Sequence, residues 1–178
     1  MFFKLNVACI LAALTVFHGQ VHGSPAAANS DDGDLVLLST QETPNGNITI
    51  WGVPEGASSS KRTAAASFPM KKRCGTNDVK CSTSHTADRT SCVQLVGSLS
   101  ANSGKAVGVS PRSICQGGCC VSWANAVSGL TQGELVNSAN DVLNGCGGDT
   151  ISGLTRDTSL NGVCTSQCLS NRPSGCEN

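Results

Sequence analysis

Ten cysteines crowd into residues 74–178 of this 178-residue chain, and their density limits what the chain can fold into. An even number of cysteines at high density is typical of a disulfide framework in an exported protein. We therefore expect about five disulfides, although ten cysteines allow hundreds of pairings and the sequence does not choose among them. The adjacent Cys119 and Cys120 are expected to bond to different partners and so to tie one segment to two parts of the fold. The ten are Cys74, Cys81, Cys92, Cys115, Cys119, Cys120, Cys146, Cys164, Cys168 and Cys176.

The N-terminus has the order of segments found in a secretory signal peptide. Lys4 precedes an apolar run from Val7 to Phe17, and a small-residue exit at Val21-His22-Gly23 follows. A buried helix of a cytosolic protein would instead show polar positions at helical spacing. The apolar run is also too short to cross a bilayer, which takes about 20 apolar residues. We therefore expect residues 1–23 to be a signal peptide that leaves with the eleventh cysteine, Cys9, and the product to be secreted without stable membrane insertion.

Residues 24–73 differ in composition from the rest of the chain. They contain no cysteine and carry two dibasic sites, Lys61-Arg62 and Lys71-Lys72-Arg73. Furin-like proteases of the late secretory pathway cut secreted precursors at such sites. Because the second site directly precedes Cys74, we expect 24–73 to be a propeptide and 74–178 to be the cysteine-rich mature domain. The alternative is an uncleaved, exposed tail whose charges are solvated.

The same segment contains a predicted β-hairpin and a predicted glycosylation site. Two β-prone runs, Leu35–Leu38 and Ile48–Trp51, flank the turn signal Pro44-Asn45-Gly46. Asn47 begins the only N-glycosylation sequon of the chain, Asn47-Ile48-Thr49. A glycan at Asn47 would lie on the propeptide and not on the mature product.

Two helices are predicted within the cysteine-rich region. Asp88 is the expected N-cap of the first, which ends before Asn102-Ser103-Gly104. Its apolar face repeats at helical spacing through Cys92, Leu95, Val96 and Leu99. Thr131 and Glu134 form a capping box for the second helix, which ends at Gly147-Gly148. Its apolar face comprises Leu135, Ala139, Val142, Leu143 and Cys146.

Short β-prone stretches lie between and after the predicted helices. They are bounded by Gly, Pro and Asn, and they cover residues 113–114, 120–124, 151–154 and 163–169. Two helices packed on a small, mostly antiparallel sheet bury both apolar faces. The predicted class is therefore α+β, stapled by about five disulfides, with Cys92 and Cys146 placed to join the helices to the sheet.

Charge and aromatic content exclude several classes of partner. The expected mature domain has six Lys and Arg against seven Asp and Glu, so it lacks the basic surface that nucleic acid or anionic lipid requires. Trp123 is its only aromatic residue, which disfavours sugar binding and makes a core position the expectation for this side chain. We expect no cofactor, no nucleic acid and a monomer.

Catalytic candidates are few. His85 with Asp88 and a serine, or the acids Asp149 and Asp157 in the manner of a glycosidase, would be needed for hydrolysis. A surface histidine in a polar loop and solvated or capping acids are the favoured explanation of these residues. Oxidising export favours disulfides over metal-binding thiolates, so we expect neither a catalytic residue nor a metal site.

Three strings in the cysteine-rich region resemble the fungal family of small secreted proteins called WD-like, which is unrelated to WD-repeat propellers. They are residues 110–115 (Ser-Pro-Arg-Ser-Ile-Cys), 119–123 (Cys-Cys-Val-Ser-Trp) and 168–176 (Cys-Leu-Ser-Asn-Arg-Pro-Ser-Gly-Cys). The plan is also more distantly similar to fungal killer toxins and to necrosis-inducing effectors. The resemblance implies a fungal, extracellular protein and carries no catalytic residues with it.

Arg112 and Arg172 lie in these strings and are the candidate contact residues, since loops held by neighbouring disulfides can present a charged side chain rigidly. Pairing of both arginines with acids or backbone carbonyls, with Asn171-Arg172-Pro173 as a turn, is the favoured explanation. We favour a non-catalytic effector or toxin-like protein that binds an extracellular host or competitor protein. A small secreted hydrolase and a structural cell-wall protein are the alternatives.

Overall fold

The computed structural model of this chain describes residues 35–54, 74–108, 111–174 and 176. The predicted signal peptide at 1–23 and both dibasic sites, Lys61-Arg62 and Lys71-Lys72-Arg73, lie outside the described residues. Within the described ranges no helix is long and apolar enough to cross a membrane.

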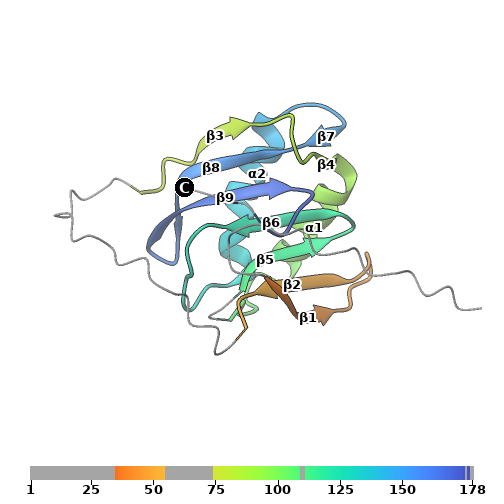
Figure 1. The fold of residues 1–178 in the computed structure, drawn as a ribbon, viewed down its shortest axis with the longest axis vertical. Helices are drawn as coiled ribbons and strands as arrows, with labels where there is room; N and C mark the ends of the chain where they lie inside the picture. The colour runs from red at the N-terminus through yellow and green to blue at the C-terminus, as the bar shows by residue number, and fades with distance from the viewer. Residues whose placement is uncertain (1–34, 55–73, 109–110, 175, 177–178) are drawn as a thin grey trace, which may run out of the picture.

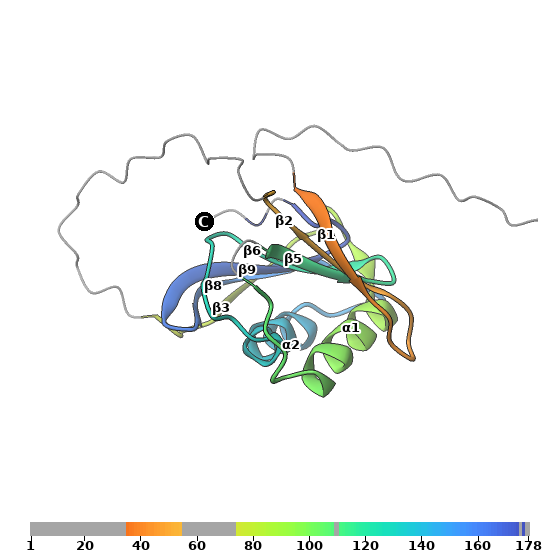
Figure 2. The ribbon, with the colours of Figure 1, turned by 90° about the horizontal axis from the view of Figure 1, so that it is seen from below.

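The fold is a seven-stranded antiparallel sheet with two helices on one face (Figures 1 and 2), which confirms the predicted α+β class. A second, two-stranded sheet joins β4 (Ala87–Asp88) to β7 (Thr150–Ile151). From one edge to the other, the large sheet is ordered β1 (Val36–Gln41), β2 (Ile48–Gly52), β5 (Pro111–Gln116), β6 (Cys119–Trp123), β9 (Val163–Ser170), β8 (Gly153–Leu160) and β3 (Asp78–Cys81).

The sheet is larger than the sequence predicts, because the N-terminal hairpin forms part of it. The turn at Pro44-Asn45-Gly46 joins β1 to β2, and β2 pairs with β5. The hairpin itself was predicted, but its docking was not. Residues 36–52 therefore add two strands to one edge of the sheet, beside a domain that was expected to begin at Cys74.

Helix α1 (Arg89–Ala101) forms as its sequence predicts. The Asp88 carboxylate accepts a hydrogen bond from the Ser91 backbone N–H at 2.9 Å, which satisfies one of the free donors at the start of the helix. The four predicted apolar residues of the helix are buried, and α1 packs against β5 and β6.

The second helix begins with a 3-10 turn at Gln132–Leu135 and continues as α2 (Val136–Gly145). The predicted capping box is present: the backbone N–H of Thr131 donates to the Glu134 carboxylate at 2.8 Å and the hydroxyl donates at 3.1 Å. The other Glu134 oxygen accepts from the Asn161 backbone N–H at 3.1 Å, which ties this helix start to the β8–β9 turn. Helix α2 packs against β3, β8 and β9.

All ten cysteines of residues 74–178 form disulfides, as predicted. Cys119 and Cys120 have different partners, as expected, because their side chains point to opposite faces of β6. Cys119 joins the sheet to α1 through Cys92, whereas Cys120 bridges to Cys115 on the neighbouring strand. The five pairs are Cys74–Cys164, Cys81–Cys146, Cys92–Cys119, Cys115–Cys120 and Cys168–Cys176.

The core lies between the sheet and the helices. Trp123 is 1% exposed and is the largest fully buried side chain, so its predicted place in the core is confirmed. Cys146, directly after α2, bonds to Cys81 at the end of β3. Both helices are therefore stapled to the sheet, as expected from the positions of Cys92 and Cys146.

Candidate functional site

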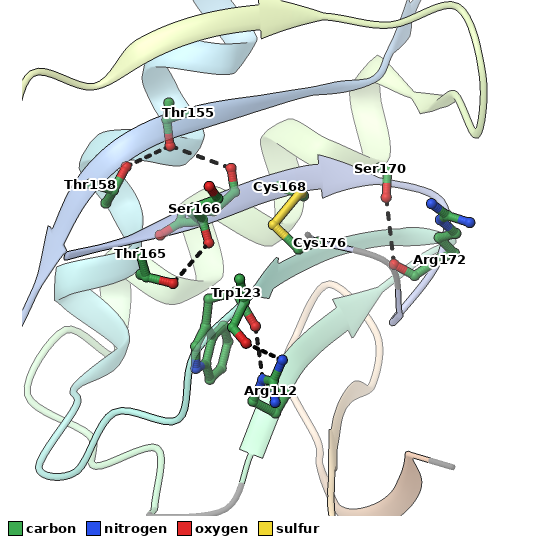
Figure 3. Close-up of a disulfide and its surroundings, with 12 residues drawn as sticks. Arg112, Trp123, Thr155, Thr158, Thr165, Ser166, Cys168, Ser170, Arg172 and Cys176 are labelled. Carbon is green, nitrogen blue, oxygen red and sulfur yellow. Dashed lines mark hydrogen bonds between the residues drawn. A yellow bond between two sulfur atoms is a disulfide. The ribbon is translucent and has the colours of Figure 1, made fainter. Parts of the chain in front are cut away.

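Arg112 lies on β5 with its guanidinium group directed at the end of β6 (Figure 3). Its Nε donates to the backbone carbonyl of Trp123 at 2.9 Å, and Nη2 donates to the carbonyl of Ala124. The side chain is half-buried. These bonds show that Arg112 pairs with backbone carbonyls, which was one of its two expected roles. Its role as a contact residue stays a prediction.

Arg172 follows β9 in the C-terminal segment that the Cys168–Cys176 disulfide closes. It is half-buried, and its backbone carbonyl accepts from the Ser170 hydroxyl at 3.5 Å. Ser170 pairs with Cys120 at the start of β6, whereas Arg112 contacts Trp123 at the end of that strand. The fold therefore places the two candidate arginines near opposite ends of β6 and does not form one patch from them.

The catalytic candidates are separated by the fold. His85 is exposed, has a positive φ of 55°, and accepts a hydrogen bond from the Asn171 backbone N–H through its carbonyl. Its proposed companion, Asp88, caps α1. Asp149 precedes β7 beside the start of α1, whereas Asp157 lies at the irregularity of β8 near Gly75. The two acids therefore adjoin different elements of the fold.

A shallow depression of about 240 Å³ lies beside the Cys81–Cys146 disulfide. Its lining has no acidic, basic or histidine side chain, so it brings no acid–base pair to a substrate. Within the described ranges, no cluster of three His, Cys, Asp or Glu residues is arranged to hold a metal ion. The depression is lined by Cys81, Ser82, Thr83, Gly145, Cys146, Gly147, Thr150 and Ser152.

The N-terminal hairpin occupies the edge of the sheet beside β5. Strand β2 pairs with β5 in antiparallel register, with Ile48 opposite Gln116 and Ile50 opposite Ile114. Ile48 is 0% exposed, and Ile50 packs against the core from a half-buried position. Asn47, the predicted glycan acceptor, is exposed at the start of β2. Its glycosylation stays a prediction.

Polar contacts fix the hairpin on this edge. The Gln116 amide nitrogen, on a side chain that is 2% exposed, donates to the Thr43 hydroxyl at 3.1 Å and to the Gly46 carbonyl at 3.2 Å. The Thr49 hydroxyl donates to the Cys115 carbonyl at 3.3 Å. The hairpin turn and its inner strand are therefore both bound by β5.

The outer strand of the hairpin, β1, ends the sheet with exposed apolar side chains. Val36, Leu37 and Leu38 are 38%, 49% and 38% exposed. Elsewhere in the described residues, Val93 and Val163 are the large hydrophobic side chains with comparable exposure. Apolar residues on an unpaired edge strand are a site for pairing with another chain.

No disulfide links the hairpin to the rest of the protein, because residues 24–73 contain no cysteine. The hairpin is held by strand pairing, by the side-chain contacts of β5 and by its connection through residues 55–73. Sequence reasoning missed this docking. The alternation Ile48-Thr49-Ile50 was its available signal, because it is typical of a strand with one buried face.

The fold and its five bridges define a small cystine-rich α+β protein of the kind found outside the cell. Residues 54–176 match the model of the family described as Fungal WD-like, and the chain belongs to this family. Comparison with curated proteins and with solved structures found no match. The more distant similarity to killer toxins and necrosis-inducing effectors is not supported by these comparisons.

Proposed function

We propose that this protein is a secreted effector or toxin-like protein that acts by binding an extracellular protein of a host or competitor, without catalysing a reaction. The observation that carries the proposal is the side of β5 that pairs with β2, which we call the β5 edge. It already binds a β-strand, supplied by the hairpin of the same chain, through main-chain pairing and one fully buried side chain.

A sheet edge suits protein recognition because its unpaired N–H and C=O groups bind any extended segment. Its side-chain pockets then add selectivity. The disulfide-bonded region behind this edge, residues 74–176, is suited to conditions outside the cell, because five disulfides and family membership are both compatible with secretion. Arg112 and Arg172 would flank β6 in this role and are proposed only as further contacts.

The proposal is tested with the full secreted chain applied to host tissue or to competitor cells. One variant combines His85→Ala, Asp149→Ala and Asp157→Asn, and a second sample has its disulfides reduced. We expect activity to survive the triple substitution and to disappear on reduction. Loss of activity in a triple variant that keeps its five disulfides and its circular dichroism spectrum would contradict the proposal and favour a hydrolase.

A further inference from the structure

We propose that the β5 edge is a strand-binding site whose built-in occupant is the hairpin of residues 36–52. Cutting the chain between Pro54 and Cys74 makes this hairpin exchangeable for an extended segment of the target protein. The inference rests on the proposed function and names the surface and the kind of partner segment that the function would use.

The pairing pattern at the edge indicates which class of ligand it accepts. Strand β5 is bonded to β6 on one side and to β2 on the other, and β2 runs in continuous register from Ile48 to Trp51. Main-chain pairing of this kind is available to any extended segment of similar length. The edge therefore accepts a strand as a class of ligand, and the hairpin shows the geometry of a bound one.

The edge is selective for the side chains of the strand that it binds. Ile48 is fully buried and Ile50 is half-buried against the core, whereas Thr49 between them donates to the Cys115 carbonyl. A segment that alternates apolar and small polar residues fits this pattern. The position of Ile48 decides most of the fit, because it combines complete burial with direct pairing to Gln116.

The edge is fixed without the hairpin. The Cys115–Cys120 bridge holds β5 to β6, and the Cys92–Cys119 bridge holds β6 to α1. All five disulfides that the structure describes lie within residues 74–176, so none of them depends on the hairpin. A binding surface that is rigid before the ligand arrives loses little entropy on binding.

The hairpin itself is only modestly attached to the rest of the protein. No disulfide joins it to residues 74–176, and its outer strand is exposed. A two-stranded hairpin is also only marginally stable by itself. The family match also begins at residue 54, directly after the hairpin. An intact connection holds the hairpin at an effective concentration in the millimolar range, and cutting it removes that advantage.

The experiment uses the full chain, secreted by a host that lacks furin-like proteases, before and after digestion with such a protease. Basic residues are adjacent only at Lys61-Arg62 and Lys71-Lys72-Arg73, so a dibasic-specific enzyme leaves residues 74–178 whole. If these sites resist the enzyme, a recognition sequence for another specific protease replaces residues 63–68. The probe is a fluorescent synthetic peptide of residues 35–54, and its binding is followed by fluorescence anisotropy.

We expect the peptide to bind the cut protein and to displace its hairpin, while the uncut protein does not bind it. An Ile48→Asp peptide should bind roughly 30-fold more weakly or worse, because a carboxylate would replace a fully buried side chain. A Leu37→Asp peptide is the matched control, since Leu37 is 49% exposed, and should bind within about threefold of the natural sequence.

Four results would overturn the inference. The first is equal binding of the peptide to cut and uncut protein, and the second is an equal loss of affinity for both Asp peptides. The third is that the cut protein keeps its original hairpin at nanomolar dilution and does not exchange it. The fourth is that the cut domain unfolds although its five disulfides are intact. The assay contains no target, so a failure here leaves the proposed function standing. A failed tissue assay would likewise leave a successful peptide exchange in place.

Discussion

At the scale of single residues, the Arg112 side chain supports the backbone at the end of β6. It is half-buried and donates to the backbone carbonyls of Trp123 and Ala124, where β6 ends and the chain leaves the sheet. A planar guanidinium group can bind two carbonyls at once, which a lysine ammonium group cannot do with the same geometry. The side chain therefore fixes the end of a central strand.

We predict that Arg112→Ala lowers the free energy of unfolding by about 1–3 kcal/mol, because both carbonyls lose a charged donor. Arg156→Ala is the matched control, since Arg156 is exposed on β8, and should change stability by about 0.5 kcal/mol or less. Chemical denaturation of both variants measures the difference. Equal stability of the two variants would show that Arg112 does not support β6, and would strengthen its candidacy as a contact residue.

At the scale of elements, the end of α2 lies very close to the sheet at Gly153, the first residue of β8. A Cβ atom at this position would lie 2.8 Å from the Cys146 sulfur, 2.9 Å from the Lys80 carbonyl and 3.0 Å from a Val142 methyl group. The absence of a side chain at Gly153 thus lets the end of α2, strand β3 and strand β8 meet at one point.

We predict that Gly153→Ala destabilises the protein by about 1–3 kcal/mol through overpacking. Gly97→Ala is the matched control, because Gly97 lies in α1 with open space around it. In a helix the change from glycine to alanine should stabilise by up to about 1 kcal/mol. Thermal unfolding of the two variants should therefore shift in opposite directions, and a shift in the same direction would contradict this packing argument.

At the scale of the whole molecule, the five disulfides close loops of very different length. Cys74–Cys164 spans a sequence separation of 90, whereas Cys115–Cys120 spans a separation of 5. A crosslink that closes a longer loop removes more entropy from the unfolded chain. The long bridge, which joins the start of the cystine-rich region to β9, should therefore stabilise the protein more than the short bridge between β5 and β6.

We predict that replacing both cysteines of the Cys74–Cys164 pair by alanine costs about 4.5 kcal/mol, against about 2 kcal/mol for the Cys115–Cys120 pair. Denaturant unfolding of the two double variants measures both losses. Intact mass must confirm four remaining disulfides in each variant. A larger loss for the short bridge would show that strand geometry, and not loop entropy, dominates the contribution of the disulfides.

Local patterns in the sequence were sufficient to predict the pieces of this fold. The Asp88 cap, the capping box at Glu134 and the apolar faces of both helices depend on residues three or four positions apart, so local spacing determines them. The hairpin at Pro44-Asn45-Gly46 is equally local. Cysteine density predicted five bridges, and residue strings in the cystine-rich region indicated the family that the comparison then showed.

Only the tertiary structure decided which pieces meet. The pairing of the cysteines, the separation of Arg112 from Arg172 and the division of Asp149 from Asp157 all depend on contacts between distant parts of the chain. The docking of Ile48 on β5 is of the same kind, since its partner Gln116 lies 68 residues further along the chain. Such contacts form because antiparallel strands must bury a shared face, and no local spacing records which strand will be the neighbour.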